Sequence, residues 1–385
     1  MVALRPAHRG AGRLRSTSPK ARPLSKHYAA SAFEAPVEAV SAPARALTFG
    51  EADVRALARH CMRYRDPIDR RAWFELVVTL ALYLPLCAVL LWAAATGLWA
   101  ALALALPAGL LLVRLFTVQH DCGHGSFFSS RRLNDGVGRA LSVLTFTPYG
   151  FWKRTHALHH GSAGDLGRRG VGDVDTYTVD EFANLTPWAR RLYRLYRHPL
   201  VLHVVGPPLY FMGLQRSPWG QALPSQQAWR SIAALNAALV AFYGALALWL
   251  GLGTVAPALL PVACVASWVG AWLFFVQHQF EHTHWAQPDD WHMQTAALHG
   301  SSHYVLPGWL NWLTGNIALH HIHHLNSRVP SYRLADCLRG DGRLGMVSRL
   351  GVRESLGCIG LSLWDERARR LVSFAEAARG RRVAS

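Results

Sequence analysis

Two long apolar runs limit what this chain can fold into. Residues 76–113 contain no Asp, Glu, Lys or Arg, and residues 231–280 form a second run with the same property. The first run has 38 residues. As an α-helix it would extend about 57 Å, nearly twice the ~30 Å hydrocarbon core of a bilayer. Gly97 interrupts the first run, and Gly251 and Gly253 interrupt the second. Each run therefore predicts two membrane-crossing helices joined by a short uncharged turn.

We expect the four crossings at residues 73–95, 98–118, 231–251 and 254–277, arranged as two hairpins. The chain has 385 residues and a formal net charge of +17, and its Arg and Lys lie outside the two turns. Positively charged segments stay in the cytoplasm, so this pattern places both termini there. A basic excess is also typical of nucleic-acid binders, but the apolar runs have no role in that class. The predicted fold is an all-α integral membrane protein with a cytoplasmic helical cap.

The segments outside the crossings differ in composition. Residues 1–47 are rich in Arg, Ala, Ser and Pro and predict a basic, disordered tail, with an organelle transit peptide as the alternative. Residues 48–71 predict a short amphipathic helix that Pro67 interrupts. Residues 199–214 are apolar but contain prolines, so we expect an interfacial or re-entrant segment. The six cysteines form no CxxC pair and predict reduced packing residues.

Histidine is the unusual residue of this composition, with twenty copies. The motif HHIHH at 320–324 places three rings on one helical face, because positions i, i+3 and i+4 stack over each other. HALHH at 156–160 repeats this spacing, and HDCGH at 120–124 has two rings four residues apart. A fourth motif, QHQFEHTH, spans 277–284 at the end of the last apolar run. Each ring buried in a plain core needs its own hydrogen-bond partner, whereas a metal ion binds several at once. The motifs therefore predict a metal site.

All four motifs leave the apolar runs on the same predicted side of the membrane. Their candidate ligands are nine imidazoles: His120, His124, His156, His159, His160, His278, His320, His323 and His324. His282, four residues after His278, is a further candidate. An octahedral ion takes six ligands, so nine predict two ions with open positions for a small molecule. Imidazole suits Zn, Cu, Fe or Ni, and two ions in a membrane setting favour iron and O₂ chemistry. The chain lacks the carboxylate-rich pattern of ferritin-like sites, in which two helices each carry an ExxH motif.

Four carboxylates near these motifs are candidates to orient the ligand rings, with a solvated acid as the alternative for each: Asp121, Asp173, Asp175 and Glu281. We expect His284 at an interface. The other histidines are expected at the surface or behind the ligands: His8, His27, His60, His198, His203, His292, His299, His303 and His321. Met212, Trp268 and Trp272 are candidates to line a substrate channel, with helix packing as the alternative.

The motifs resemble the histidine boxes of the membrane fatty acid desaturases. HDCGHGSF at 120–127 is similar to the first box, and residues 152–160 are similar to the second. Residues 320–325, followed by RVPSY at 328–332, are similar to the third box with its downstream Pro and Tyr. The resemblance covers about residues 73–335 and involves separate motifs in the same order.

Two further segments resemble the bacterial acyl-lipid type, nearest to its Δ12/omega-6 branch: RRGVGDVDTY at 168–177 and VQHQF at 276–280. The resemblance implies a desaturase domain over 48–335, a cytoplasmic C-terminal segment over 336–385, and a location in a bacterial inner membrane. It implies a di-iron centre held by the nine histidines, without a separate acid or base. It further implies O₂ as co-substrate and electrons from a ferredoxin or a cytochrome b5-like protein. The implied product is a cis double bond in a fatty acyl chain.

Two other functions compete with this one. A di-iron membrane hydroxylase or ketolase acting on alkyl chains, sterols or carotenoids would use the same centre. A membrane metal transporter would carry its histidines inside the crossings, along a continuous polar path. Here the motifs stand at the ends of the apolar runs, which disfavours the transporter.

Overall fold

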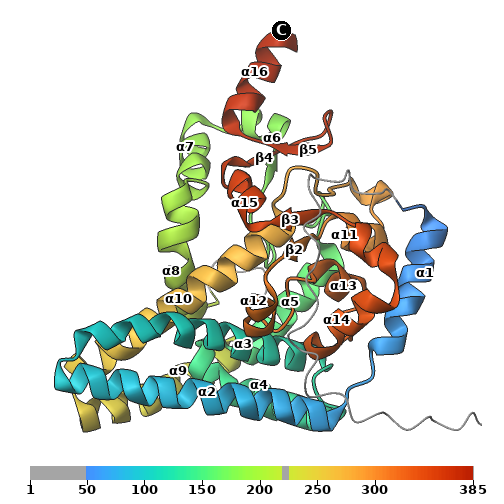
Figure 1. The fold of residues 1–385 in the computed structure, drawn as a ribbon. Helices are drawn as coiled ribbons and strands as arrows, with labels where there is room; N and C mark the ends of the chain where they lie inside the picture. Colours follow the sequence, from blue (N-terminus) through green and yellow to red (C-terminus); the bar gives the residue numbers. More distant parts are fainter. Residues whose placement is uncertain (1–48, 219–224, 385) are drawn as a thin grey trace, which may run out of the picture. The chain divides into compact units, whose positions relative to one another are not determined.

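The computed structural model describes residues 49–218 and 225–384, which are mostly helical (Figure 1). The expected tail at 1–47 lies outside these residues. Among the described residues, four helical segments are long and apolar enough to cross a membrane, as predicted. They are α2 (Asp69–Thr96), the 3₁₀ turn Trp99–Leu104 with α3 (Ala105–His124), α9 (Gln226–Leu250) and α10 (Leu252–His278). They extend beyond the expected bounds because flanking polar residues continue the helices, so α3 and α10 both end in a histidine.

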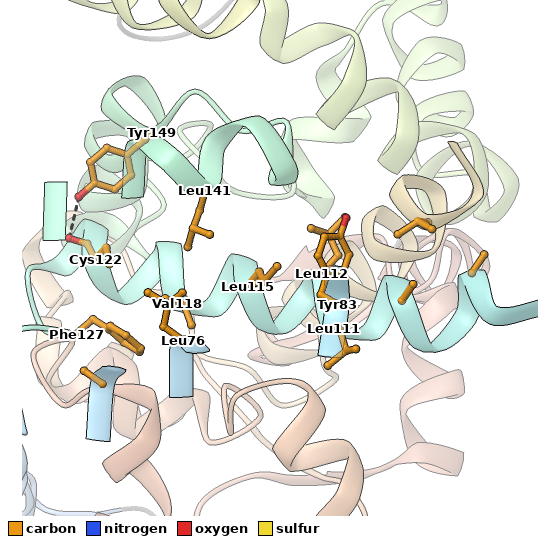
Figure 2. Close-up of a cluster of buried hydrophobic side chains, with 14 of the residues drawn as sticks. Leu76, Tyr83, Leu111, Leu112, Leu115, Val118, Cys122, Phe127, Leu141 and Tyr149 are labelled. Carbon is orange, nitrogen blue, oxygen red and sulfur yellow. Dashed lines mark hydrogen bonds between the residues drawn. The ribbon is translucent and has the colours of Figure 1, made fainter. Parts of the chain in front are cut away.

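The apolar helices pack closely where small residues allow it. Gly97 ends α2 in a left-handed backbone (φ 75°), which an L side chain rarely adopts. α10 contacts both α2 and α3. At Gly109 of α3, an added Cβ would lie 2.4 Å from Cγ1 of Val265 on α10, so this contact requires glycine. Figure 2 shows part of the hydrophobic core around α3, where Leu115 and Leu141 are buried. Leu141 belongs to α4 (Arg131–Thr145), which packs along α3.

A second group of helices surrounds α13 (His320–Leu325). Its neighbours are α1 (Glu51–Cys61), α11 (Met293–His299) and α14 (Ser331–Gly340). Fully buried Leu57, Leu298 and Leu334 come one from each of these helices and pack with Ile322 of α13. This core holds α13 in place although the helix has only 6 residues.

The remaining helices are short: α5 (Tyr149–Ser162), α6 (Val179–Asn184), α7 (Pro187–Tyr196), α8 (Gly206–Met212), α12 (Gly308–Leu313), α15 (Val352–Ser355) and α16 (Phe374–Ala384). The expected helix at 48–71 is divided, because α1 begins after Gly50 and ends at Cys61, whereas Asp69 already belongs to α2. The stretch 199–214 forms the π-helix Leu200–Val205 and then α8, with exposed apolar side chains such as Leu209. Its position at a membrane interface stays a prediction.

The described residues also contain five short strands, which the prediction of an all-α chain did not include. β1 (Tyr177–Thr178), β4 (Leu363–Asp365) and β5 (Arg370–Val372) form one sheet in the order β1-β4-β5. β2 (His303–Val305) and β3 (Arg349–Gly351) form a parallel pair. Strands of two or three residues show no alternation in a sequence, so they escaped prediction. All six cysteines are unpaired, as expected.

A buried ion pair joins α2 to α3 inside the apolar layer. Glu75 and Arg114 have 8% and 5% of their surface exposed. The Arg114 guanidinium donates to the Glu75 carboxylate, to Oγ1 of Thr79 at 3.0 Å and to the carbonyl of Trp312. It also lies 4.1 Å from the centre of the Trp312 ring. Because each charge has several partners, the pair fixes α2, α3 and α12 relative to one another.

Removing one member of this pair should destabilise the protein strongly. Glu75→Ala leaves a buried, unpaired guanidinium, and we expect a loss of about 3–5 kcal/mol in the free energy of unfolding. The double variant Glu75→Leu/Arg114→Met should lose less than Glu75→Ala alone, because it buries no charge. Thermal unfolding in detergent measures both variants. Glu51→Ala, which removes an exposed partner of Arg55, is the control and should cost under ~1 kcal/mol. Equal losses for Glu75→Ala and Glu51→Ala would contradict this account.

Candidate metal centre

Four helices bring nine histidines to one place. α3 carries two in its last turns, α5 and α13 carry three each, and the last residue of α10 is the ninth. They are His120, His124, His156, His159, His160, His278, His320, His323 and His324. All nine rings come from helices, so their spacing is set by helical periodicity rather than by loops. These are the nine candidates of the sequence motifs.

The nine imidazoles divide into two groups, and within each group the candidate ligand atoms lie within 4.8 Å of one another. The five-histidine group consists of His120, His124, His156, His160 and His323. The four-histidine group consists of His159, His278, His320 and His324. The two groups share helices but no residue, so the centre has two adjacent places for an ion.

The HxxHH spacing explains how two helices serve both groups. In α5, the i, i+4 pair His156 and His160 joins the five-histidine group, and His159 joins the other. In α13 the roles are exchanged, because the i, i+4 pair belongs to the four-histidine group and His323 belongs to the five-histidine group. The ring at i+3 is rotated from the pair around the helix, so it faces the neighbouring group. Each box is therefore a bridge between two ligand sets.

The distances between ring nitrogens fit a shared ion. Nε2 of His156 lies 3.0 Å from Nε2 of His120 and 3.1 Å from Nε2 of His160. In the other group, Nε2 of His278 lies 3.0 Å from Nε2 of His320. Two nitrogens at right angles on an ion, each at ~2.1 Å, are about 3.0 Å apart. The buried Nε2 atoms of His124, His159 and His324 have no hydrogen-bond partner among the described residues. Both observations indicate atoms placed to bind a metal.

Three of the rings are oriented from behind by an acceptor. Nδ1 of His120 donates to Oδ1 of the buried Asp121 at 3.1 Å, and Nδ1 of His159 donates to Oδ1 of Asp173. Nδ1 of His278 donates to the Gly300 carbonyl at 3.1 Å. A proton held on Nδ1 leaves the lone pair of Nε2 free for a metal. Asp121 and Asp173 were candidates for this role, whereas a backbone carbonyl carries no signal in the sequence.

Asp121 also connects the first histidine motif to the segment that follows the third histidine motif. Its second oxygen accepts the backbone N–H of Ser331 at 2.6 Å, at the start of α14. The other two candidate carboxylates act elsewhere. Asp175 has no histidine partner among the described residues, and Glu281 pairs with Arg370 at 3.0 Å on the surface. The side chain of His282 is exposed and lies outside both groups.

Burial keeps the ligand rings neutral. The pKa values of His156, His160, His320, His323 and His324 lie well below the ordinary value, first because burial disfavours the charged form and second because neighbouring imidazoles repel a proton. The neutral imidazole is the form that binds a metal. The cluster is therefore prepared for ions at physiological pH.

Some of the other histidines, which were expected at the surface or behind the ligands, are buried. His321 is fully buried, with its ring centre 5.7 Å from that of His303, so it is not a surface residue. His60 is also buried and contacts the Cys337 carbonyl through Nε2 at 2.9 Å. Both pack within the core around α13. His198 and His292 are exposed, as expected, and His284 is half-buried. His8 and His27 lie outside the described residues.

The candidate channel residues take part in helix packing. Nε1 of Trp268 donates to the Val204 carbonyl at 2.8 Å, and Nε1 of Trp272 approaches the Tyr304 hydroxyl at 3.4 Å. Met212 is half-buried at the end of α8. These contacts fit the packing alternative for the two tryptophans.

Comparison with known proteins agrees with this geometry. The family model described as fatty acid desaturase matches residues 97–343, which include all nine histidines. A fatty acid desaturase of Bacillus subtilis is 36% identical over 273 residues, which cover 71% of this chain and 77% of that protein.

Two cyanobacterial relatives from Synechocystis sp. carry more specific names. The sn-1 acyl-lipid omega-3 desaturase (ferredoxin) is 31% identical over 243 residues, which cover 59% of this chain and 63% of that protein. The sn-1 oleoyl-lipid 12-desaturase is 26% identical over 309 residues, which cover 73% and 78%. The family model spans more than half of the chain, and the B. subtilis relative covers more than two thirds of it. The chain therefore belongs to the fatty acid desaturase family of oxidoreductases.

Proposed function

We propose that this protein is a membrane desaturase that inserts a cis double bond into a fatty acyl chain, at a centre of two iron ions. The observation that carries the proposal is the division of nine imidazoles, all buried or half-buried, into two adjacent groups. When bound, two iron ions supply the O₂-dependent oxidation that an unactivated CH₂–CH₂ segment requires. The reaction takes the acyl chain, O₂, two electrons and two protons to the alkene and two waters.

The protein's own residues prepare this reaction. The five-histidine group would hold one ion, and the four-histidine group, with one ring fewer, would hold the other with more room for a small molecule. Asp121 and Asp173 keep two of the rings in the binding tautomer. The surrounding core excludes water, which protects a reactive centre from side reactions.

The names of the relatives support a lipid substrate and an external donor. Two Synechocystis proteins are named as acyl-lipid and oleoyl-lipid desaturases, and one of these names includes ferredoxin. We propose a lipid-linked acyl chain as the substrate, with Δ12/omega-6-like regiochemistry. The electrons would come from a ferredoxin or a cytochrome b5-like protein.

The proposed site lies at the cytoplasmic surface of a bacterial inner membrane. α3 and α10 both end in a candidate ligand, so these two helices run in the same direction across the bilayer. With four candidate spans among the described residues, both ends of the described chain would lie on the side of the histidines, and the Arg and Lys distribution supports a cytoplasmic location for that side.

Expression in a bacterial host that lacks polyunsaturated lipids tests the reaction. We expect the host's lipids to gain a new cis double bond, which gas chromatography and mass spectrometry of the acyl chains detect. His159→Ala should reach the membrane in normal amount but form no product, because His159 lies on α5 outside every candidate span. A hydroxylated product without a new double bond would contradict the desaturase proposal, and an active His159→Ala protein would contradict the role of His159.

Two neighbouring carboxylates test how the metal is held. Asp173→Asn replaces the carboxylate acceptor behind His159 with a neutral, weaker amide acceptor, and we expect 10–100-fold weaker iron binding at one of the two sites. Asp175→Asn removes the same charge two residues away, at a side chain without a histidine partner, and should leave iron binding unchanged. Iron per purified chain, measured by plasma mass spectrometry against chelator concentration, separates them. Equal losses in the two variants would indicate a general charge effect instead.

A second pair of variants tests the assignment of the ninth ligand. His278→Ala removes a buried ring from the four-histidine group, and we expect about one iron per chain in place of two. His282→Ala removes an exposed ring four residues further along the chain, so the iron content should stay at the wild-type level. Iron analysis of both purified proteins is the measurement. Loss of iron from His282→Ala would make His282 a ligand.

A further inference from the structure

A surface depression lies beside the third histidine motif. It has a volume of about 410 Å³ and is lined by Arg55, Arg59 and Met62, by Gln294 of α11, and by Leu325 and Asn326 at the end of α13. None of its lining residues belongs to a candidate membrane span. The depression therefore lies among the helices around α13, outside the candidate spans.

The lining resembles the surface of a protein–protein interface. Met62 has 45% of its surface exposed and forms an apolar floor with Ala58. Arg55 and Arg59 lie one turn apart on α1, and Arg63 continues the same exposed row. Methionine and arginine are enriched at such interfaces, with the apolar part in the centre and charge at the rim.

The nearby acids leave this rim basic. Arg55 pairs with Glu51 at 3.0 Å, but their side chains are 58% and 78% exposed, so the pair is weak and available for exchange. Arg65 lies near Asp66, and Asp53 pairs with Arg343 on the far side of α1. Arg59 and Arg63 have no ion pair among the described residues. An acidic partner would meet net positive charge here.

Two lining residues of the depression, Leu325 and Asn326, directly follow candidate ligands in the chain. Leu325 follows His324 of the four-histidine group, and His324 follows His323 of the five-histidine group. The side chain of Asn326 contacts the Met62 sulfur at 3.3 Å, which links the end of α13 to the residue that follows α1. The rate of electron transfer falls exponentially with distance. A donor bound here would have only a short distance over which to pass electrons to both histidine groups.

We propose that this depression is the docking site of an acidic electron-donor protein, which rests on the proposed function. Desaturation consumes two electrons, and a donor must bring its redox centre close to the metal site. Complementary charge would steer the donor to the rim, and the apolar floor would hold it. The charged rim and its place on α1, away from the spans, disfavour a lipid as the occupant.

The test uses the full-length protein in detergent, with a plant-type [2Fe–2S] ferredoxin as the protein donor and dithionite as a reductant that needs no docking site. Arg55→Glu/Arg59→Glu should raise the KM for ferredoxin about tenfold or more and weaken its salt dependence. The rate with dithionite should stay within about twofold of wild type. Arg367→Glu/Arg379→Glu makes the same charge change at exposed residues away from the depression and should leave both rates unchanged.

Two outcomes overturn the docking site while the proposed function stands. One is a ferredoxin KM that is unchanged in Arg55→Glu/Arg59→Glu, and the other is an equal rise in the control variant. Wild-type protein that forms no double bond with either reductant would instead refute the proposed function.

A binding measurement covers the case in which the charge reversal disturbs folding. Gln294→Cys places a thiol in the depression without changing its charge, and Gln294 is exposed at the rim. Oxidised ferredoxin should slow the reaction of this thiol with a maleimide by severalfold, as read by mass spectrometry of the labelled peptide. An unchanged labelling rate at saturating ferredoxin would overturn the proposal.

Discussion

The structure depends on one chemical problem, which is how to bury nine imidazoles in a single core. Each ring carries two polar nitrogens, and a buried polar atom without a partner costs free energy. In three of the rings, Nδ1 donates a hydrogen bond to an acceptor behind the ring, which is Asp121, Asp173 or the Gly300 carbonyl. The inward Nε2 atoms instead face each other, as between His156 and His120 at 3.0 Å. Lone pairs that converge in this way favour a cation at their centre, so metal binding and the stability of this core are linked.

The HxxHH motif solves the geometry of two neighbouring ions with few helices. The rings at i and i+4 belong to one group and would bind one ion, and the ring at i+3 belongs to the other group and would bind the second ion. α5 and α13 do this with opposite assignments, so the two groups are locked together. α3 and α10 then contribute only from their ends, where the apolar layer stops. Any shift of α13 would therefore disturb both groups, and α13 is packed on several sides by fully buried side chains such as Leu57 and Leu298.

Much of this was predictable from local patterns in the sequence. The absence of charge over 76–113 and 231–280 identified the long apolar helices, and helical periodicity identified which rings share a face. The division of the rings into two groups was not predictable, because it depends on how α5 and α13 are rotated in the fold. For the same reason the sequence left open whether His321 lies at the surface or behind the ligands, and the structure buries it fully. Arg114 lies in a predicted crossing, and only tertiary contacts reveal Glu75 as its partner.

The candidate metal centre has one side toward the apolar helices and another toward α13 and α1, and on the proposed function each side would receive a different reactant. Two of its four helices come from the apolar layer and end at the candidate ligands, so on the proposed function an acyl chain in the bilayer would reach the site along α3 and α10. The opposite boundary is formed by α13, whose end opens at an aqueous surface next to α1. On the proposed function, the lipid substrate and the electron donor approach from opposite sides and do not compete for space. One short helix, α13, with four imidazole rings, would then both carry ligands and form a short connection from the aqueous surface to the proposed metal site.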